Sequence, residues 1–496
     1  MTTLPVPKSI KLMFGLGQAA ESIKNFGFGT LLLLYYNQVL GLSGTYAGLA
    51  VFIAILADAI SDPAVGSWSD GFQSRSGRRH PFMLASILPL GITFYFLFMP
   101  PAGLSEFQLF LWFTVFSVLV RTALTFFHVP YLSLGAELSQ DYEERTRIVV
   151  VRTAFGLCAS LLVVAIAWNF FFVQTPDDPT PQLSREPYFK YALLSSFIMM
   201  VMMLGCWWGT RSWVKNLAGS NQQPQPFSLK RVYTDLYQAL QNPSFSTLFI
   251  STLLFFVYAG THSALSMHLK TFFWQLDTEG IQYWQYGAIV GGVLGLPFTP
   301  LLNRLLDKKW TVILGCLGSA ACNVLPVVLE MAGLMPHDPD ILVPILVVLS
   351  TLSTMAVIQS SVTVASMMGD IADEHELNHG TRQEGVYFGS FNFSLKCTSA
   401  LGNLVAGLCL DLISFPVNSK PELLSEDIQF DFGIMYSSVA LILIWSTWAF
   451  WAYGLDKAKH ARIVEQLIAR RTANKPTLRP HTDSDLADST VPVSAG

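Results

Sequence analysis

The chain has 496 residues, of which 52% are hydrophobic and only 13% are charged, and its mean hydropathy is +0.44. Soluble domains carry about 25% charged residues, so this composition excludes an ordinary soluble protein. The formal net charge of −4 is too small to indicate a nucleic-acid partner. All six cysteines lie inside apolar runs without zinc-ligand spacing, so neither a disulfide framework nor a metal or other cofactor is expected.

Apolar stretches recur from end to end at the length of a membrane span, which is about 20 residues. They predict an all-α integral membrane protein, most simply a monomer in the plasma (inner) membrane, with the lipid bilayer as a partner. The twelve predicted transmembrane helices centre on residues 18–40, 45–67, 82–100, 107–134, 148–172, 190–210, 245–269, 283–302, 310–331, 341–368, 386–413 and 430–453.

The longest polar interruption, residues 211–243, divides these helices six plus six. It contains the linker-like run from Asn221 to Pro226. We therefore expect an N-terminal six-helix bundle over 1–210, a cytoplasmic central loop over 211–243, and a C-terminal six-helix bundle over 244–453. A polar cytoplasmic tail over 454–496 is expected to be disordered at its end. Basic loops follow helix 2 and helix 8 at matching positions, as two repeats of a major facilitator fold require.

Basic residues predict the orientation. The side of the N-terminus holds 22 of the 30 lysines and arginines. The opposite loops hold only Arg185, Lys190, Lys270 and Lys420. Because positively charged loops stay in the cytoplasm, both termini are predicted to be cytoplasmic.

Helix 2 carries two carboxylates at membrane depth. Asp58 and Asp62 are four residues apart and so share one helical face. Ionisable groups there cost about 2.5–3.5 kcal/mol each on insertion scales, which favours a functional role. The pair suits a coupling cation, Na⁺ or H⁺. The alternative is a structural ion pair with Lys24 or Arg121.

Helix 4 offers two neighbours to this site. Thr125 supplies a hydroxyl as a further cation ligand, and His128 supplies a group that titrates near neutrality. A structural histidine remains the alternative for His128.

Further polar residues within helices are candidates for solute binding. Arg152 and Lys396 can hold polar or anionic groups, and Asn392 lies one turn before Lys396 on the same face. Helix 1 adds Glu21, Lys24 and Asn25, although Glu21 and Lys24 can also neutralise each other. His262 and Gln359 more simply form hydrogen bonds between packed helices.

The string from His375 to His379 matches the H-E-x-x-H pattern of zinc proteases. It indicates an alternative class of protein, an intramembrane metalloprotease. We expect it in a charged loop between helices 10 and 11, with its local helix ending at Gly380. No third ligand stands out in a nearby apolar helix. A transporter, and not an enzyme, is therefore the preferred interpretation.

The run from Asp62 to Asp70, followed by Ser74 to Pro81, closely resembles the signature of the glycoside–pentoside–hexuronide:cation symporters. This family is the melibiose-permease branch of the major facilitator superfamily, and further similar segments extend over about residues 11 to 455. The resemblance implies cation sites at Asp58 and Asp62 with Thr125 beside them. It also implies that Arg152 and Lys396 hold a sugar or link the two halves. The string from Gly380 to Gly385 resembles the same family, which explains the protease-like pattern as a loop variant.

Departures from the family leave the solute open. In the sugar-transporting permeases a Lys-Asp pair binds sugar where this chain has Glu21 and Ser22, and an Asp and a Trp stand where it has His128 and Leu132. The string from Phe127 to Tyr131 instead resembles the animal sodium-dependent lysophosphatidylcholine symporters. We expect cation:solute symport of a small molecule, with a sugar or glycoside as the family default. A lysolipid or another amphipathic or anionic solute is the alternative.

Overall fold

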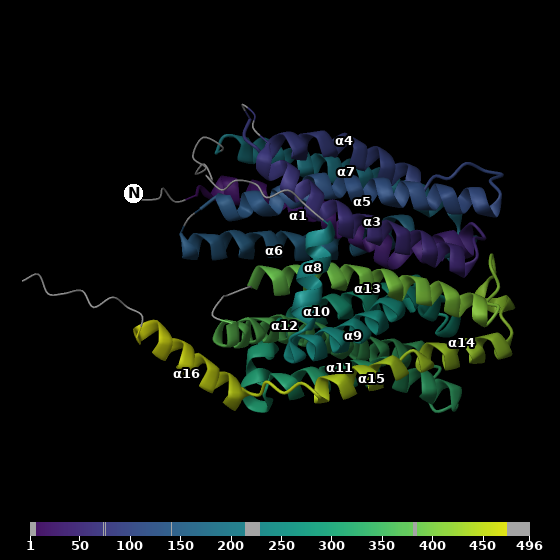
Figure 1. Cartoon of the computed structure of the whole chain (residues 1–496). Coiled ribbons are helices and arrows are strands. Elements are labelled where there is room, and N and C mark those ends of the chain that lie inside the picture. The colour runs from purple at the N-terminus through teal and green to yellow at the C-terminus, as the bar shows by residue number, and fades with distance from the viewer. Residues whose placement is uncertain are drawn as a thin grey trace, which may run out of the picture.

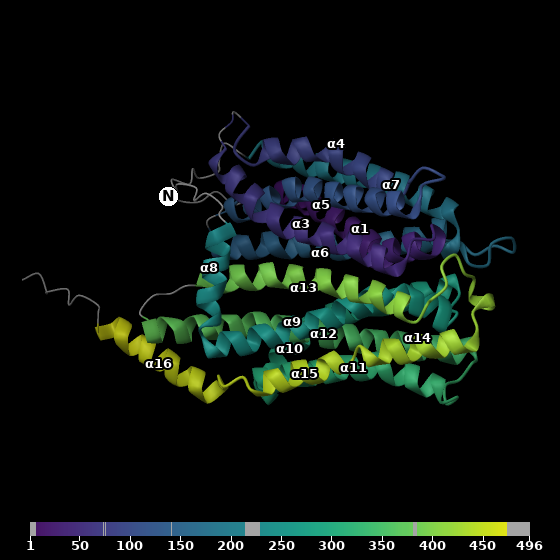
Figure 2. The same ribbon diagram turned by 45° about the vertical axis from the view of Figure 1, so that its right-hand side comes forward.

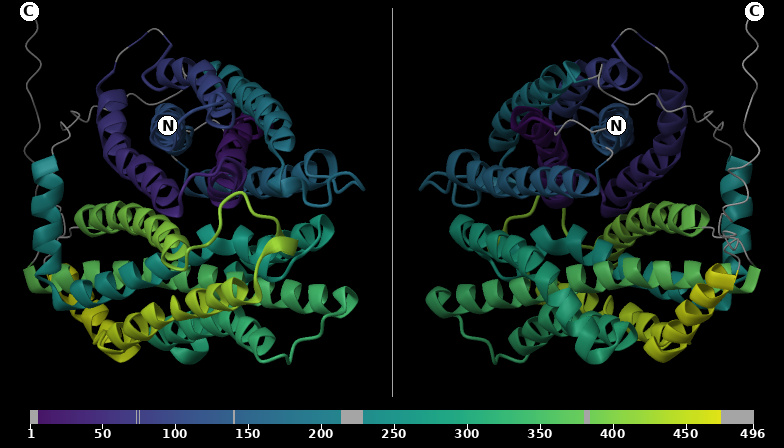
Figure 3. Two further views of the ribbon diagram at one scale, coloured as in Figure 1. Left: turned by 90° about the vertical axis from the view of Figure 1, so that its right-hand side faces the viewer. Right: turned by 90° about the vertical axis from the view of Figure 1, so that its left-hand side faces the viewer.

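The computed structural model describes residues 6–72, 74, 76–139, 141–213, 229–379 and 384–473. Nearly all of them are helical, and the long helices run side by side in two stacked groups (Figures 1 and 2). Figure 3 looks along the helices and shows the chain's first half above its second half. This arrangement confirms the predicted fold class, an all-α membrane protein of the major facilitator type.

The N-terminal half supplies the first group. Its first span begins with α1 (Lys8–Phe26) and continues through a π-helical segment η1 (Gly27–Leu31), α2 (Leu32–Leu34) and a second π-helical segment η2 (Tyr35–Val39). The other spans are α3 (Gly44–Gly71), α4 (His80–Leu97), α5 (Glu106–Glu137), α6 (Tyr142–Ile166) with its extension η3 (Ala167–Phe171), and α7 (Arg185–Arg211).

The C-terminal half supplies the second group. Its spans are α9 (Pro243–His268) with its extension η6 (Leu269–Phe273), α10 (Thr278–Leu306), α11 (Lys308–Met331), α12 (Pro339–His379), α13 (Glu384–Leu412), and the broken helix α14 (Glu426–Ser438) and α15 (Leu441–Trp451).

Within the described residues, eleven helices are long and apolar enough to cross a bilayer. The first span, Lys8–Val39, is not among them, because charged and polar residues such as Glu21, Lys24 and Asn25 lower its hydropathy. It nevertheless packs along α6 and α7 inside the N-terminal group. Counted with the eleven, it completes the twelve predicted spans.

Two helices were not predicted. The central segment, expected to be a loop, contains α8 (Leu229–Leu240), which stands upright, across the direction of the spans, in Figures 1 and 2. The tail contains α16 (Lys457–Ala473), which packs on the end of α12. Both are polar helices outside the apolar runs, and a search for membrane spans passes over such helices.

The two halves touch most closely where α3 meets α13. A Cβ atom on Gly407 would lie 2.0 Å from the backbone oxygen of Gly44, and one on Gly48 would lie 2.6 Å from the backbone oxygen of Asn403. Small residues let transmembrane helices approach to backbone contact. Glycine at these positions therefore allows the halves to meet.

Hydrogen bonds between the halves gather at the end of the molecule distant from the termini. There the Asp411 carboxylate accepts from the backbone N–H groups of Gly44 and Thr45, at 2.8 and 2.7 Å. Asn37 and His268 lie 3.1 Å apart, and Gln38 donates to the carbonyl of Pro416 at 3.1 Å. These bonds hold that end together.

Candidate transport site

A cavity of about 620 Å³ lies between the two halves, near the middle of the spans. Its walls come from α1, α3, α5 and α13. The lining side chains belong to Glu21, Lys24, Asn25, Ile55, Asp58, Asp62, Arg121, Leu124, Thr125, His128, Leu132, Leu395, Lys396 and Ser399. Pockets of about 300–1,000 Å³ are typical of small-molecule sites, so this cavity can hold an organic solute.

The two carboxylates of α3 converge on one hydroxyl. Thr125 Oγ1 lies 2.9 Å from Asp58 Oδ1 and 2.8 Å from Asp62 Oδ1. A hydroxyl has one proton and donates to one acceptor at a time. One carboxylate oxygen and the lone pairs of the hydroxyl are therefore left without a donor, and a proton or a small hard cation could bind to them.

A proline inside α3 leaves one backbone carbonyl oxygen of this region without its usual hydrogen-bond donor. Pro63 follows Asp62 directly and lies within the helix. Because proline has no N–H, the carbonyl of Ala59, four residues earlier, lacks its intrahelical hydrogen bond. The sequence therefore places an under-used backbone acceptor in the same turns as the two carboxylates.

Lys396 of α13 reaches both carboxylates from the opposite half. Its Nζ lies 3.0 Å from Asp58 Oδ2 and also donates to Asp62 Oδ2. Arg121 of α5 lies 3.5 Å from Asp58 Oδ2 and stacks over the ring of Phe28 at 4.7 Å. The carboxylates are thus neutralised by side chains, and Lys396 links the two halves through them.

His128 meets Glu21 instead of the α3 carboxylates. Its Nε2 lies 2.7 Å from Glu21 Oε2, although the angles are not those of a hydrogen bond. Gln18 donates to the same oxygen at 2.6 Å. The structure thus brings His128 into the cavity on its helix 1 side, away from the carboxylate pair.

The lining charges balance. Glu21, Asp58 and Asp62 face Lys24, Arg121 and Lys396, and Lys24 is buried. An arriving cation must therefore displace or reorient a resident positive charge, because a site that is already neutral attracts a further cation weakly.

The other predicted solute-binding residues are placed differently. Asn25 lines the cavity, whereas Ser22 donates to the carbonyl of Gly156 at 3.0 Å and lines a neighbouring cavity. Arg152 lies on α6 and is not part of the central lining. The side chain of Asn392 lies outside the described part of the structure.

Sequence reasoning missed two features of the interior. It treated Arg121 only as a structural partner, yet Arg121 lines the cavity. It also assigned Lys270 to an outer loop, which is wrong: Lys270 lies in η6 at the end of the seventh span and is buried. The apolar residues on both sides of it, from Leu269 to Trp274, could have indicated this burial.

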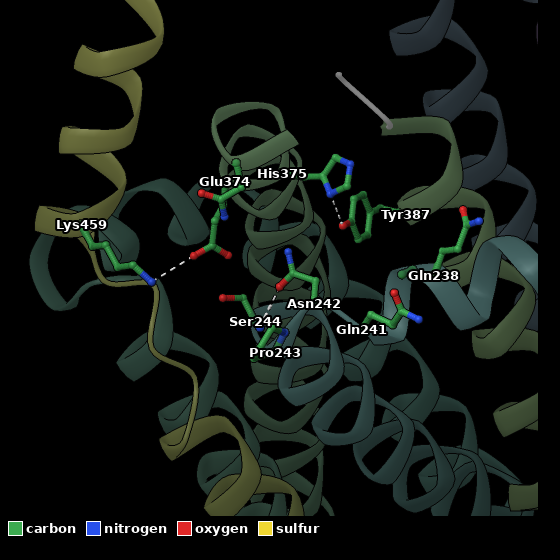
Figure 4. Close-up of a pocket in the computed structure, with 11 residues that line it drawn as sticks. Gln238, Gln241, Asn242, Pro243, Ser244, Glu374, His375, Tyr387 and Lys459 are labelled. Carbon is green, nitrogen blue, oxygen red and sulfur yellow. Dashed lines mark hydrogen bonds and ion pairs between the residues drawn. The ribbon is translucent and has the colours of Figure 1, made fainter. Parts of the chain in front are cut away.

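The protease-like string lies elsewhere, at the end of the molecule that carries the termini. The prediction of a loop was wrong, because α12 runs through to His379. Gly380, where the local helix was expected to end, lies outside the described residues. His375 lines a separate cavity of about 610 Å³, where its Nδ1 lies 3.0 Å from the hydroxyl of Tyr387 (Figure 4). The neighbouring Glu374 accepts from Lys459 of α16 at 3.0 Å. Among the described residues, no group of His, Cys, Asp and Glu side chains is arranged to hold a metal ion.

Twelve spans in two halves around a charged central cavity define a membrane transporter of the major facilitator type, not an enzyme. The family model for MFS/sugar transport proteins matches residues 13–457. The chain belongs to this family, which confirms the predicted resemblance to the glycoside–pentoside–hexuronide symporters.

Relatives along nearly the whole chain carry the names of symporters. The putative glycoside/cation symporter YagG of Escherichia coli is 23% identical, over 93% of this chain and 95% of its own. The sodium-dependent lysophosphatidylcholine symporter 1 of Gallus gallus is also 23% identical, over 90% and 87%. The fold resembles the solved nucleoside transporter NupG, with a TM-score of 0.57 at 12% identity, over 90% of this chain and 98% of that one.

Proposed function

We propose that this transporter is a cation:organic solute symporter whose coupling cation binds between Asp58 and Asp62, with Thr125 as a further ligand. The observation that carries the proposal is the contact of Lys396 with both carboxylates. A resident ammonium group occupies the place that a coupling cation would take. Cation and Lys396 therefore compete for the same oxygens.

This competition provides a mechanism of coupling. When a cation occupies the carboxylate pair, Lys396 is released toward the adjacent cavity, where its three N–H donors can meet a solute. When the cation leaves, Lys396 returns to the carboxylates and the solute loses a partner. Each ligand thus raises the affinity for the other, as thermodynamic linkage requires.

Sodium is the cation we favour. The carboxylate oxygens and the Thr125 hydroxyl form an all-oxygen set, which hard cations prefer. The name of the Gallus gallus relative supports sodium as well. Proton coupling is the alternative, since either carboxylate can carry a proton.

For the solute we propose a sugar or glycoside, the class named for the family and for the YagG relative. The cavity supports this with hydrogen-bonding side chains such as Glu21 and Asn25. A lysolipid is the second candidate, because leucine and isoleucine side chains alternate with these charges and the Gallus gallus relative is named for one. We further propose a monomer in the plasma (inner) membrane with both termini in the cytoplasm.

Uptake by Asp62→Asn proteoliposomes tests the cation site. The variant should insert normally but lose roughly 5- to 150-fold in sodium stimulation of uptake, the usual range of a coupling factor. Downhill counterflow should persist. A solute panel of neutral glycosides and lysolipids, run with and without sodium, identifies both ligands. Normal uphill accumulation by both Asp58→Asn and Asp62→Asn would falsify the proposed site.

A further inference from the structure

Two smaller cavities lie near the central one, and the first of them lies between the two halves. The first, of about 260 Å³, shares Asn25 with the central cavity. The second, of about 290 Å³, lies within the C-terminal half and shares Lys270 and Gln285 with the first. These shared side chains connect the transport site to the interior of the second half.

A buried cation stands where the two smaller cavities meet. The Lys270 side chain is 4% exposed, and its ammonium lies 5.3 Å from the centre of the Trp284 ring. The described residues that line these two cavities include no Asp or Glu. A cation–π contact offsets only part of the cost of burying an ammonium group, and Lys270 has no anionic partner among these described lining residues.

His262 adds a second unsatisfied group to the same space. It is 6% exposed and lies between the rings of Tyr258 and Tyr436, at centroid distances of 4.3 and 4.2 Å. Neither of its ring nitrogens has a hydrogen-bond partner within the described structure. Buried polar atoms in native proteins nearly always have partners, so an orphaned imidazole that lines a cavity indicates a missing ligand.

Neighbouring polar groups are held in place by the protein. Trp168 of the N-terminal half donates to Gln285 at 2.9 Å, and Asn323 donates to Ser353 at 2.8 Å and to Tyr258 at 3.2 Å. The walls around Lys270 and His262 are therefore ordered before a ligand enters. Such preorganisation reduces the cost of binding.

We propose that Lys270 and His262 form a subsite for an anionic group of an organic solute, either a carboxylate or a phosphate. The excess of positive charge and the unsatisfied imidazole both favour anionic oxygen atoms. The remainder of the solute then extends past Asn25 toward the central cavity. This inference rests on the proposed function, and it deepens that function by giving the solute a negative charge.

Equilibrium binding to the purified transporter in nanodiscs tests the subsite with two matched pairs of probes. Methyl β-D-glucuronide and methyl β-D-glucoside differ only at the carboxylate. 1-Oleoyl lysophosphatidate and 1-oleoylglycerol differ only at the phosphate. The wild type should prefer the anionic member of one pair, and the pair that shows the preference tells whether the source is a sugar acid or a lysolipid.

Lys270→Gln should weaken binding of the preferred anion by about 10- to 100-fold, the worth of a charge-assisted hydrogen bond, and leave the neutral member nearly unchanged. His262→Phe should weaken it in the same direction. Lys270→Arg keeps the positive charge and should keep the preference, which separates loss of charge from loss of folding. Lys420→Gln removes the same charge from an exposed loop at the same end and serves as the control.

The proposal is overturned if the ratio of the affinity for the anionic probe to that for its neutral counterpart is the same in Lys270→Gln as in the wild type. It is also overturned by a wild type without preference for the anion in either pair. Binding is measured without an ion gradient, so a failure of cation stimulation would refute the proposed symport and leave this ratio measurable.

Discussion

At the scale of single residues, Lys396 is the group through which we propose that the cation and the solute are coupled. It reaches across from α13 to the α3 carboxylates, at 3.0 Å from Asp58. Without it, two negative charges would remain one turn apart in a partly dehydrated cavity, which is costly unless a cation replaces the lysine. Lys396 therefore stabilises the state without a bound cation.

Lys396→Met should uncouple transport. A cation can then occupy the carboxylates without releasing any group toward the solute, so cation-driven accumulation should fall by about tenfold or more, within the usual span of coupling factors. Counterflow without a gradient should fall less, because it requires solute binding but no coupling to the cation. Side-by-side uphill uptake and counterflow in proteoliposomes measure both. Equal loss of the two activities would indicate a purely structural role for this lysine.

The protease-like string leads to a second prediction at this scale. His375 forms a hydrogen bond with Tyr387 near the end of α12 and lines a different cavity from the carboxylate pair of α3, and the family is one of transporters. His375→Gln should change uptake by no more than about twofold, because substitutions outside a functional site usually cost about 0.5 kcal/mol or less. Dialysis against EDTA should also leave uptake unchanged. Uptake lost with EDTA and restored by zinc would contradict this interpretation.

At the scale of elements, contact between α3 and α13 sets how closely the halves can meet. Backbone atoms of Gly44 and Gly407 touch, and the Asp411 carboxylate binds the first N–H groups of α3. A carboxylate at a helix N-terminus satisfies groups that the helix itself leaves unbonded. The contact is therefore both close and polar, which suits an interface that must open and close.

Gly407→Ala should open this interface. The new Cβ would lie 2.0 Å from the Gly44 carbonyl oxygen, and overpacking of this kind costs about 1–3 kcal/mol, equivalent to a shift of about 5- to 150-fold toward the separated state. A cysteine placed at Ser266, in a background without native cysteines, should then react faster with an impermeant thiol reagent applied from outside.

The matched control for this experiment is Gly389→Ala on the same helix. A Cβ there meets nothing within 4 Å. It should leave the reaction rate at Ser266 unchanged. Equal rates in the Gly407 and Gly389 variants would show that the glycine contact does not hold the halves together.

At the scale of the whole molecule, basic residues predict the orientation. Moving Lys270 into the membrane leaves at the opposite end Arg185 and Lys190, in the first two turns of α7, and Lys420 in a loop, which strengthens the asymmetry. Impermeant reagents applied to intact cells should label engineered cysteines within 173–189 and 414–428. They should miss cysteines within 211–243 and the tail. Labelling near Gln223 from outside would reverse the assigned orientation.

The sequence by itself determined the architecture and the placement of two carboxylates on one face of the second span. Apolar runs of membrane length give the spans, because the bilayer imposes helices on any segment that crosses it. Asp58 and Asp62 could be paired in advance because helical periodicity alone places them on one face. The family also followed from contiguous motifs in helix 2 and its loop.

Only the tertiary structure decided which distant side chains meet. The partners Lys396 and Thr125 come from α13 and α5, and the contact of His128 with Glu21 joins α5 to α1. The sequence pattern predicts that Lys270 lies in a loop, whereas in the structure the π-helical segment η6 at the end of α9 places it in the interior. Helical spacing predicts which side chains of one helix lie next to each other. Contacts between helices depend on the packing angle and on how closely small residues such as glycine let the helices approach, and no local sequence pattern encodes these.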